Sequence, residues 1–191
     1  MAVSFGTSGL RGPAEGFTPE ICRAYVAAFL DHSCADASER AVLLGADLRA
    51  SSPSIVAACA SAVVAAGWTP INAGNVPTPA LAAYALARRL PAIMVTGSHI
   101  PEIYNGIKFY RPDGEFLKED EAPVRERALA LLARGDVAPA VVLPAIDATI
   151  AESYVERYVA AFPGAPLAGL KVGVDLHSAV GRDLTVSILE R

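Results

Sequence analysis

Three copies of one local pattern constrain the fold of this chain more than any other feature. Each copy is a hydroxyl residue followed by proline: Thr18-Pro19, Ser52-Pro53 and Thr78-Pro79. A hydroxyl can cap the free N–H groups of a helix start, and proline suits the first helical position. After the first two pairs, apolar residues recur at helical spacing. The pattern predicts three helices that begin near residues 18, 52 and 78.

Short apolar runs lie between these helices. Residues 41–44, 69–72 and 92–95 are each bounded by turn residues and are predicted strands. A fourth strand is predicted over residues 106–110. Strands that alternate with helices imply βαβ units and a mostly parallel sheet. The predicted fold is therefore a three-layer α/β/α domain with a mixed, largely parallel sheet.

A hairpin and a charged helix are expected to complete this domain. Pro112-Asp113-Gly114 has the composition of a tight turn after the fourth strand. Residues 117–133 have a charged, amphipathic pattern that predicts a helix. The small residues of 134–143 are typical of a boundary. We therefore assign residues 1–140 to one domain.

Residues 141–191 resemble a linker followed by the beginning of a second, similar domain. A helix is predicted over residues 148–162, a strand over 171–175 and a helix over 183–191. A lone strand–helix unit cannot bury both faces of its strand. We therefore expect a truncated piece of a longer polypeptide, whose missing domains would be its partners.

Composition excludes several classes of function. The chain is 53% hydrophobic and 19% charged, with a net charge of −4, which favours a packed globular protein without a basic surface for nucleic acid. Residues 50–87 carry no charge, but prolines, glycines and asparagines interrupt them, so no membrane span is predicted. Three scattered cysteines and the lack of a signal-peptide pattern indicate a cytoplasmic protein.

Three loops that follow predicted strands are expected to converge at one edge of the sheet. They cover residues 45–52, 74–78 and 96–101. Open α/β sheets bind their ligands at the carboxyl ends of the strands. These loops therefore form the expected ligand site.

Four residues in and near the loops can support phosphoryl transfer. Ser98 and His99 are neighbours in the third loop. Lys108 lies on the fourth strand, expected at the sheet's edge, and Arg11 lies in a segment rich in glycine and hydroxyls. Phosphoryl transfer needs a hydroxyl to carry phosphate, cations against its charge and a proton carrier. These residues supply all three.

Four motifs, in order, resemble those of the α-D-phosphohexomutases, the family of phosphomannomutases and phosphoglucomutases. They are F-G-T-S-G-L-R-G at residues 5–12, D-x-R-x-S-S at 47–52, V-P-T-P-A at 76–80 and T-G-S-H-I-P at 96–101, followed by Y-N-G-I-K-F. The last is similar to the family's phosphoserine loop, usually written T-A-S-H-N-P. The similarity runs from about residue 4 to residue 121, with a weaker likeness at 175–184.

The resemblance implies an isomerase that moves phosphate between the 1- and 6-positions of mannose or glucose phosphates. A phosphoserine at Ser98 would give its phosphate to the substrate, and the resulting hexose 1,6-bisphosphate would reorient and return its other phosphate. Arg11 and Lys108 would stabilise charge and transfer protons, and His99 would orient the transfer. The alternative is a non-catalytic α/β module that binds a sugar phosphate or a protein.

The resemblance also implies substrate contacts and a magnesium ion. Thr7, Ser8, Arg11 and Lys108 are the expected substrate-binding residues. The phosphate on Ser98, with a charge of about −1.5 to −2, would be one Mg²⁺ ligand. In the family, the other ligands come from an aspartate-rich loop that this chain lacks. The chain alone is therefore expected to be catalytically incomplete.

Two residues depart from the family's usual loop. Gly97 replaces alanine, which is expected to loosen the loop, and Ile100 replaces asparagine, which removes a polar group beside the site. This form favours a phosphomannomutase-like member, while mannose, glucose and glucosamine phosphates all stay open as substrates. Asp47 and Arg49 are expected to cross-link loops within the domain.

Overall fold

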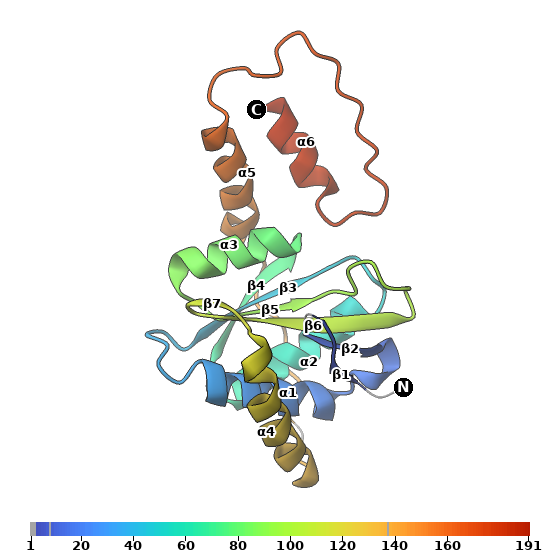
Figure 1. Ribbon diagram of the computed structural model, residues 1–191, viewed down its shortest axis with the longest axis vertical. Coiled ribbons are helices and arrows are strands. Elements are labelled where there is room, and N and C mark those ends of the chain that lie inside the picture. Colours follow the sequence, from blue (N-terminus) through green and yellow to red (C-terminus); the bar gives the residue numbers. More distant parts are fainter. Residues whose placement is uncertain (1–2, 8, 137) are drawn as a thin grey trace.

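The computed structural model describes residues 3–7, 9–136 and 138–191, which form a layered α/β fold (Figure 1). The strands are β1 (Ser4–Phe5), β2 (Leu10–Pro13), β3 (Ala41–Ala46), β4 (Thr69–Asn75), β5 (Ala92–Val95), β6 (Tyr104–Arg111) and β7 (Gly114–Glu115). The helices are α1 (Pro19–Ser33), α2 (Ser52–Ala65), α3 (Thr78–Arg88), α4 (Glu121–Ala133), α5 (Thr149–Ala161) and α6 (Arg182–Glu190), with 3-10 turns η1 (Ala14–Gly16) and η2 (Lys118–Asp120).

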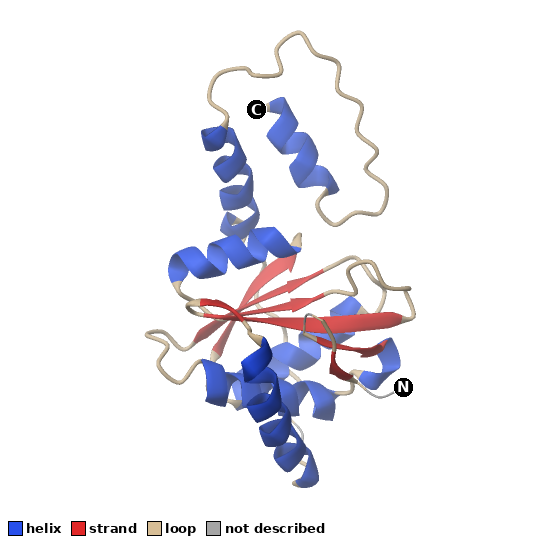
Figure 2. Ribbon diagram, in the orientation of Figure 1, coloured by secondary structure: helices blue, strands red, loops and turns tan. Residues whose placement is uncertain are grey.

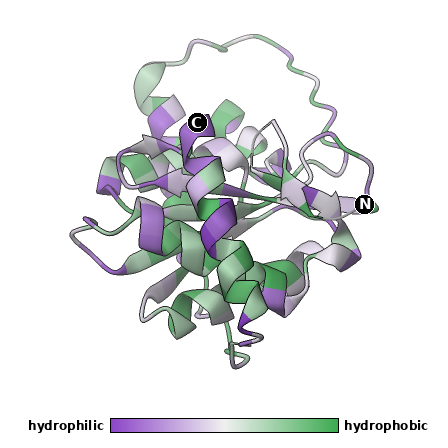
Figure 3. Cartoon of the chain, turned by 60° about the horizontal axis from the view of Figure 1, so that its bottom comes forward, coloured by the Kyte–Doolittle hydropathy of each residue, from purple (hydrophilic) through white to green (hydrophobic). Residues whose placement is uncertain are grey.

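The sheet separates two helical layers, as Figure 2 shows. One hydrophobic cluster joins α1, α2 and α4 to one face of the sheet. A second cluster joins α3 and α5 to the other face. Figure 3 shows hydrophobic residues gathered where these elements meet. The predicted three-layer α/β/α fold is therefore confirmed.

The sheet is mixed, as predicted. Its seven strands in the described residues follow the order β1-β2-β6-β5-β3-β4, with β7 beside β6. β3 pairs parallel with β4 and β5, and the other pairs are antiparallel. The sequence did not indicate β1 or β2, because residues 6–12 are mostly glycines and hydroxyls and have no alternating apolar pattern. These two strands extend the sheet beyond its parallel part.

The three predicted helices form, but only one hydroxyl caps as expected. Thr18 Oγ1 accepts a hydrogen bond from the N–H of Ile21 at 3.4 Å. α2 begins at Ser52, one residue earlier than the pattern implies, and the Ser52 hydroxyl donates to Asp47 at 2.5 Å instead. α3 begins at Thr78 without a side-chain cap. The Ser52 hydroxyl is thereby free of its own helix and available to the loop beside it.

Residues 141–191 contribute two helices and long irregular segments. The helix predicted over 148–162 is α5, which buries Ile150 against the α3 layer. The helix predicted over 183–191 is α6. The strand predicted over 171–175 is not formed. No strand lies beside it in the described part of the chain, and an unpaired strand leaves its backbone groups without partners.

The three cysteines and the uncharged stretch of residues 50–87 lie mainly in the interior. Cys22, Cys34 and Cys59 are buried and free. The uncharged stretch 50–87 supplies α2, β4 and most of α3. Among the described residues, no helix has both the length and the apolar character needed to cross a bilayer. The apolar stretch is therefore core.

Aromatic packing in the larger cluster generates a stability prediction. Phe29 is fully buried, and its ring lies 4.7 Å from that of Phe109. Phe29→Ala should lower the free energy of unfolding by about 3–5 kcal/mol, because it removes buried area and leaves a cavity. Leu129→Ala, at a side chain that is 57% exposed on α4, should change it by no more than about 0.5 kcal/mol. Urea unfolding measures both, and equal losses would contradict this core.

Candidate functional site

Ser98 lies just beyond the carboxyl end of β5. The N–H of Thr96 donates to the carbonyl of Gly106 at 2.9 Å, which extends the β5–β6 pairing by one residue. The N–H of Ser98 donates to Thr96 Oγ1, also at 2.9 Å. Ser98 has a left-handed backbone with φ of +53°, which costs a non-glycine residue on the order of 1–2 kcal/mol. Its side chain is exposed, so a strained turn presents the hydroxyl to solvent.

His99 is a polar neighbour of this hydroxyl. Ser98 Oγ lies 3.4 Å from His99 Nδ1, and the tautomer of the ring decides which atom donates. Both side chains are exposed. The predicted pairing of hydroxyl and imidazole is therefore present at the tip of the loop.

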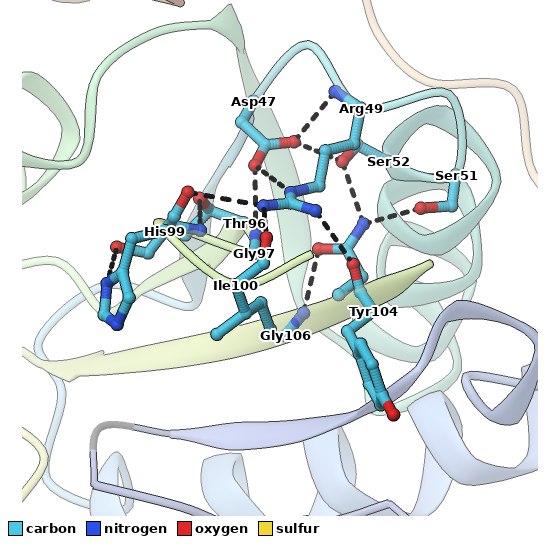
Figure 4. A network of polar contacts seen from close by, with 12 residues as sticks. Asp47, Arg49, Ser51, Ser52, Thr96, Gly97, His99, Ile100, Tyr104 and Gly106 are labelled. Carbon is cyan, nitrogen blue, oxygen red and sulfur yellow. Dashed lines mark hydrogen bonds and ion pairs between the residues drawn. The ribbon is translucent and has the colours of Figure 1, made fainter. Parts of the chain in front are cut away.

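Arg49 binds the backbone of this loop from the neighbouring β3–α2 loop (Figure 4). Its guanidinium donates to four carbonyls, those of Pro101 at 2.9 Å, Tyr104 at 3.2 Å, Ser98 at 3.3 Å and Ile100 at 2.6 Å. Its Nε faces Asp47 Oδ2 at 3.3 Å, and both side chains are 13% exposed. The cross-linking that the sequence predicted for Asp47 and Arg49 is confirmed.

Asp47 ties the same loop to the start of α2. Its Oδ2 accepts from the N–H of Gly97 at 3.0 Å. Its Oδ1 accepts from the N–H of Arg49 at 3.1 Å and from the Ser52 hydroxyl at 2.5 Å. Both oxygens of the carboxylate are thus engaged by donors within the protein.

Asn105, a buried residue that the sequence analysis missed, completes this network. Its side-chain amide donates to Ser51 Oγ at 2.8 Å and to Ser52 Oγ at 3.0 Å. Its Oδ1 accepts from the N–H of Gly106 at 2.8 Å. The sequence signal for Asn105 was its place directly before Gly106 in the motif of residues 104–109.

The second expected loop, residues 74–78, joins the first loop at a different place. The N–H of Val76 donates to the carbonyl of Ala46 at 3.3 Å.

Arg11 and Lys108 point to the same face of the sheet. Arg11 on β2 lies opposite Gly106 on β6, two residues from Lys108. Opposed residues, and residues two apart on one strand, share a face. Lys108 also lies opposite Met94, which belongs to the cluster beneath α3. Thr96 pairs with Gly106 as well, so Arg11 occupies the sheet row that leads to the Ser98 loop.

The pKa of the Lys108 amine is lowered from its usual value. Burial is the largest cause and the positive charge of Arg11 is the second, while the carboxylate of Glu115 opposes them. The sequence placed this strand at an edge of the sheet, and that expectation is wrong. β6 lies between β2 and β5, which explains why Lys108 is only partly exposed.

Comparisons with known proteins point to one family. The model for "Phosphoglucomutase/phosphomannomutase, alpha/beta/alpha domain I" matches residues 2–131. The chain belongs to the phosphoglucomutase/phosphomannomutase family. Phosphomannomutases of Sinorhizobium fredii and Salmonella muenchen are each 41% identical to it, over 100% and 95% of this chain.

A solved structure of a phosphoglucomutase/phosphomannomutase family protein from Burkholderia thailandensis has the same fold. Its TM-score is 0.75 at 28% identity, over 95% of this chain and 40% of that one. The chain covers 41% of the Sinorhizobium protein and 37% of the Salmonella protein. It therefore spans about two fifths of the length of these relatives.

The opening motif of this mutase-family chain lies at the β1–β2 turn. Thr7 is exposed in that turn, and Gly6 N–H donates to the Gly9 carbonyl at 2.9 Å across it. Arg11 follows on β2. Ser8, the other predicted substrate-binding residue of the motif, lies outside the described residues. The structure therefore puts one of the two hydroxyls on the same strand pair as Arg11.

Gly97, the first departure from the family's usual mutase loop, lies against Asp47 and Arg49. It is buried, and its N–H is bound to Asp47. A Cβ at this position would overlap the guanidinium carbon of Arg49. The absent side chain leaves room for the Arg49 guanidinium in this arrangement. Ile100, the second departure, contributes its backbone carbonyl to the same guanidinium.

The two occupied oxygens of Asp47 generate a second prediction. Asp47→Asn should lower the free energy of unfolding by about 1–3 kcal/mol, because the new NH₂ group must face a donor and leave it unsatisfied. Asp113→Asn is the matched control, since that side chain is 75% exposed and its ion pair should contribute about 0–1 kcal/mol. Denaturant unfolding compares the two, and an equal effect would refute the assigned bonds.

The neighbours of Lys108 generate a third prediction, with two opposite signs. Arg11→Gln should raise the pKa of Lys108, because it removes a repelling positive charge. Glu115→Gln should lower that pKa further, because it removes an attracting negative charge. NMR titration of the lysine Cε resonance measures both variants. Shifts in the same direction would show that the electrostatic environment is assigned wrongly.

Proposed function

We propose that this chain carries the phosphorylated serine of a phosphohexomutase, which exchanges phosphate between the 1- and 6-positions of mannose or glucose. The carrying observation is the exposed Ser98 hydroxyl, presented by a braced turn at the carboxyl end of β5. Arg11 and Lys108 stand on adjoining strands of the same sheet. The phosphomannomutases among the relatives support mannose phosphate as the preferred substrate.

In the proposed step, the bond between Ser98 Oγ and phosphorus breaks while a hexose hydroxyl oxygen bonds to that phosphorus. The hydroxyl proton passes to a base, and Ser98 Oγ takes up a proton. The hexose 1,6-bisphosphate then turns round and returns its other phosphate to Ser98 by the reverse process. One phosphate remains on the serine after each turnover, and the bisphosphate is the intermediate. It is also the activator, because it can give a phosphate to an unphosphorylated Ser98.

Each of the other predicted residues has a role in this step. The lowered pKa of Lys108 gives more neutral amine near neutral pH than an ordinary lysine has, and that amine can accept the hydroxyl proton. The guanidinium of Arg11 can pair with phosphate oxygens in a bidentate manner. His99 Nδ1, at 3.4 Å from Ser98 Oγ, orients the transferred group. Thr7 and Ser8 contact the substrate.

Magnesium is part of the proposal only through the phosphate on Ser98. Residues 3–7, 9–136 and 138–191 contain no group of three or more metal-binding side chains. Asp47 is already occupied by three donors. The described residues therefore do not form a magnesium site by themselves, and no step above depends on one. When bound, the ion would supply positive charge against the phosphate.

The remaining ligands and sugar contacts belong to further domains of the same polypeptide in this proposal. Residues 1–140 form the domain that carries the phosphate, and 141–191 are a linker followed by the beginning of the next domain. The exposed apolar side chains of Leu170, Val172 and Val174 support this division, because such groups normally pack against a neighbour. The free cysteines support a reducing, cytoplasmic setting.

Intact-mass measurement tests the proposal on the full-length protein. After incubation with glucose 1,6-bisphosphate, the protein should carry one phosphate, and Ser98→Ala should carry none. Ser54→Ala, whose exposed hydroxyl bonds only to the Ser51 carbonyl in the described structure, is the control and should keep the phosphate. A phosphate that survives in Ser98→Ala would exclude the proposal. No uptake by the unaltered protein would favour a non-catalytic binding module.

A further inference from the structure

We propose that Asn105 is a positioning residue for phosphoryl transfer at Ser98. Its buried side-chain amide holds two parts of the site in place at once: the loop that carries the serine, and the strand pair that carries Arg11. The inference rests on the proposed function and extends it to a residue that does not touch the substrate.

The orientation of the Asn105 amide is fixed by a group that can only donate. The backbone N–H of Gly106 lies 2.8 Å from Asn105 Oδ1, so this end of the amide must be its oxygen. The NH₂ end therefore donates to Ser51 Oγ at 2.8 Å and to Ser52 Oγ at 3.0 Å. Both amide hydrogens are thus in use, and the side chain is fully buried. Asn105 has no donor left for a substrate.

Ser52 connects this amide to the Ser98 loop. The Ser52 hydroxyl has one hydrogen, and its oxygen lies 2.5 Å from Asp47 Oδ1. A carboxylate can only accept, so that hydrogen goes to Asp47 and the Asn105 amide binds a lone pair of the same hydroxyl. Asp47 Oδ2 in turn accepts from the N–H of Gly97 at 3.0 Å (Figure 4). One chain of hydrogen bonds therefore runs from Asn105 to the residue before Ser98.

Gly106 connects the same amide to the cationic side of the site. Its N–H is held by Asn105 Oδ1, and its carbonyl accepts from the N–H of Thr96 at 2.9 Å. Gly106 also lies opposite Arg11 in the β2–β6 pair. Asn105 is thus bonded to the backbone at the point where the Ser98 loop leaves the β5–β6 pairing and β2 lies alongside. One buried side chain therefore sets the spacing between the phosphate carrier and this guanidinium.

An apolar side chain in place of Asn105 would break both connections. The N–H of Gly106 would lose its acceptor and the two serine hydroxyls would lose a donor, which is costly for buried groups. The Ser98 loop would then shift relative to Arg11. A misplacement of about 1 Å can cost on the order of 100-fold in rate. Because Asn105 does not touch the substrate, its loss should lower kcat and leave KM nearly unchanged.

Kinetics of mannose 1-phosphate conversion by the full-length protein test this role. Asn105→Leu, which has a similar volume and no polar group, should lower kcat at least about tenfold and change KM less than about threefold. Ser61→Ala removes another buried polar side chain, one that bonds to backbone atoms of Ala57 and Val141. It is the matched control and should keep kcat. Unchanged kcat in Asn105→Leu, or a KM that rises as much as kcat falls, would overturn the inference.

Asn105→Asp tests whether the donor itself is needed. A protonated carboxyl can donate to the Ser52 hydroxyl as the amide does. A carboxylate cannot donate, and it competes with Asp47 for the single hydrogen of Ser52. The chain of bonds should therefore hold below the pKa of the new carboxyl and break above it.

The surroundings of position 105 raise that pKa above the ordinary value of an aspartate. Burial raises it, by up to about 3–5 units for a fully buried carboxyl, and the negative charge of Asp47 acts in the same direction. Arg49, whose Nε lies 3.3 Å from Asp47, opposes them. Arg11 and Lys108 point from the opposite face of the sheet, since residues 105 and 106 alternate along β6.

The kcat of Asn105→Asp, divided by that of the unaltered protein at each pH from about 5 to 9, measures this effect. The ratio should be near one at the acid end and fall at least about tenfold as the pH rises. Asn72→Asp, whose amide donates to the Pro144 carbonyl outside the site, is the matched control and should give a flat ratio.

A low, flat ratio for Asn105→Asp would contradict the proposal, because it would reduce Asn105 to a filler of space. Should Asn105→Leu fail to fold, the ratio for Asn105→Asp still decides the question, since its acid end gives the repaired chain of bonds and its alkaline end the broken one.

These outcomes are separable from failure of the proposed function. If the unaltered protein takes up no phosphate from glucose 1,6-bisphosphate and converts no mannose 1-phosphate, the function itself fails. If it turns over normally and both Asn105 variants match it at every pH, only the positioning role fails.

Discussion

The candidate site depends on one charged side chain, that of Arg49, whose bonds go to loop carbonyls and to Asp47. The guanidinium of Arg49 joins the loop after β3 to the loop after β5, and Asp47 fixes that guanidinium from behind. Such an arrangement satisfies carbonyls that a surface turn would leave to water. The reactive hydroxyl of Ser98 can then stand in an unfavourable conformation, because surrounding bonds over-determine it.

The sheet supplies what the loops cannot. Its parallel strands bring the loops after β3 and β5 to one rim, which is where open α/β sheets place ligands. The antiparallel strands β6 and β2 then place Lys108 opposite Met94 of β5 and Arg11 opposite Gly106 of β6, on one face of the sheet. Burial and, second, the positive charge of Arg11 lower the pKa of the Lys108 amine. The parallel strands thus position the loops of the site, and the antiparallel strands position its two cationic side chains.

The sequence revealed the regular part of this architecture and missed its long-range details. Strands β3, β4 and β5 could be predicted because short apolar runs with turn residues at both ends are typical of strands. β2 was not, since its pairing with β6 is set by distant partners and not by a local pattern. The sequence pattern predicted that Ser52 would cap a helix, but its hydroxyl donates a hydrogen bond to Asp47 instead. The sequence could not predict the surroundings of Gly97, because the atoms that lie where a Cβ would be come from Arg49, a distant residue in the chain.

The place of β2 in the sheet has a consequence for how the molecule is made. Arg11 is synthesised before β6, yet its strand pairs with residues 104–107 of β6. Until β6 has been synthesised, the opening segment has no neighbour in the sheet and must wait in solution or in transient contacts. Contacts between distant parts of a chain form late and slowly. The cationic side of the site therefore cannot assemble before β6 exists, although Arg11 is synthesised long before that strand.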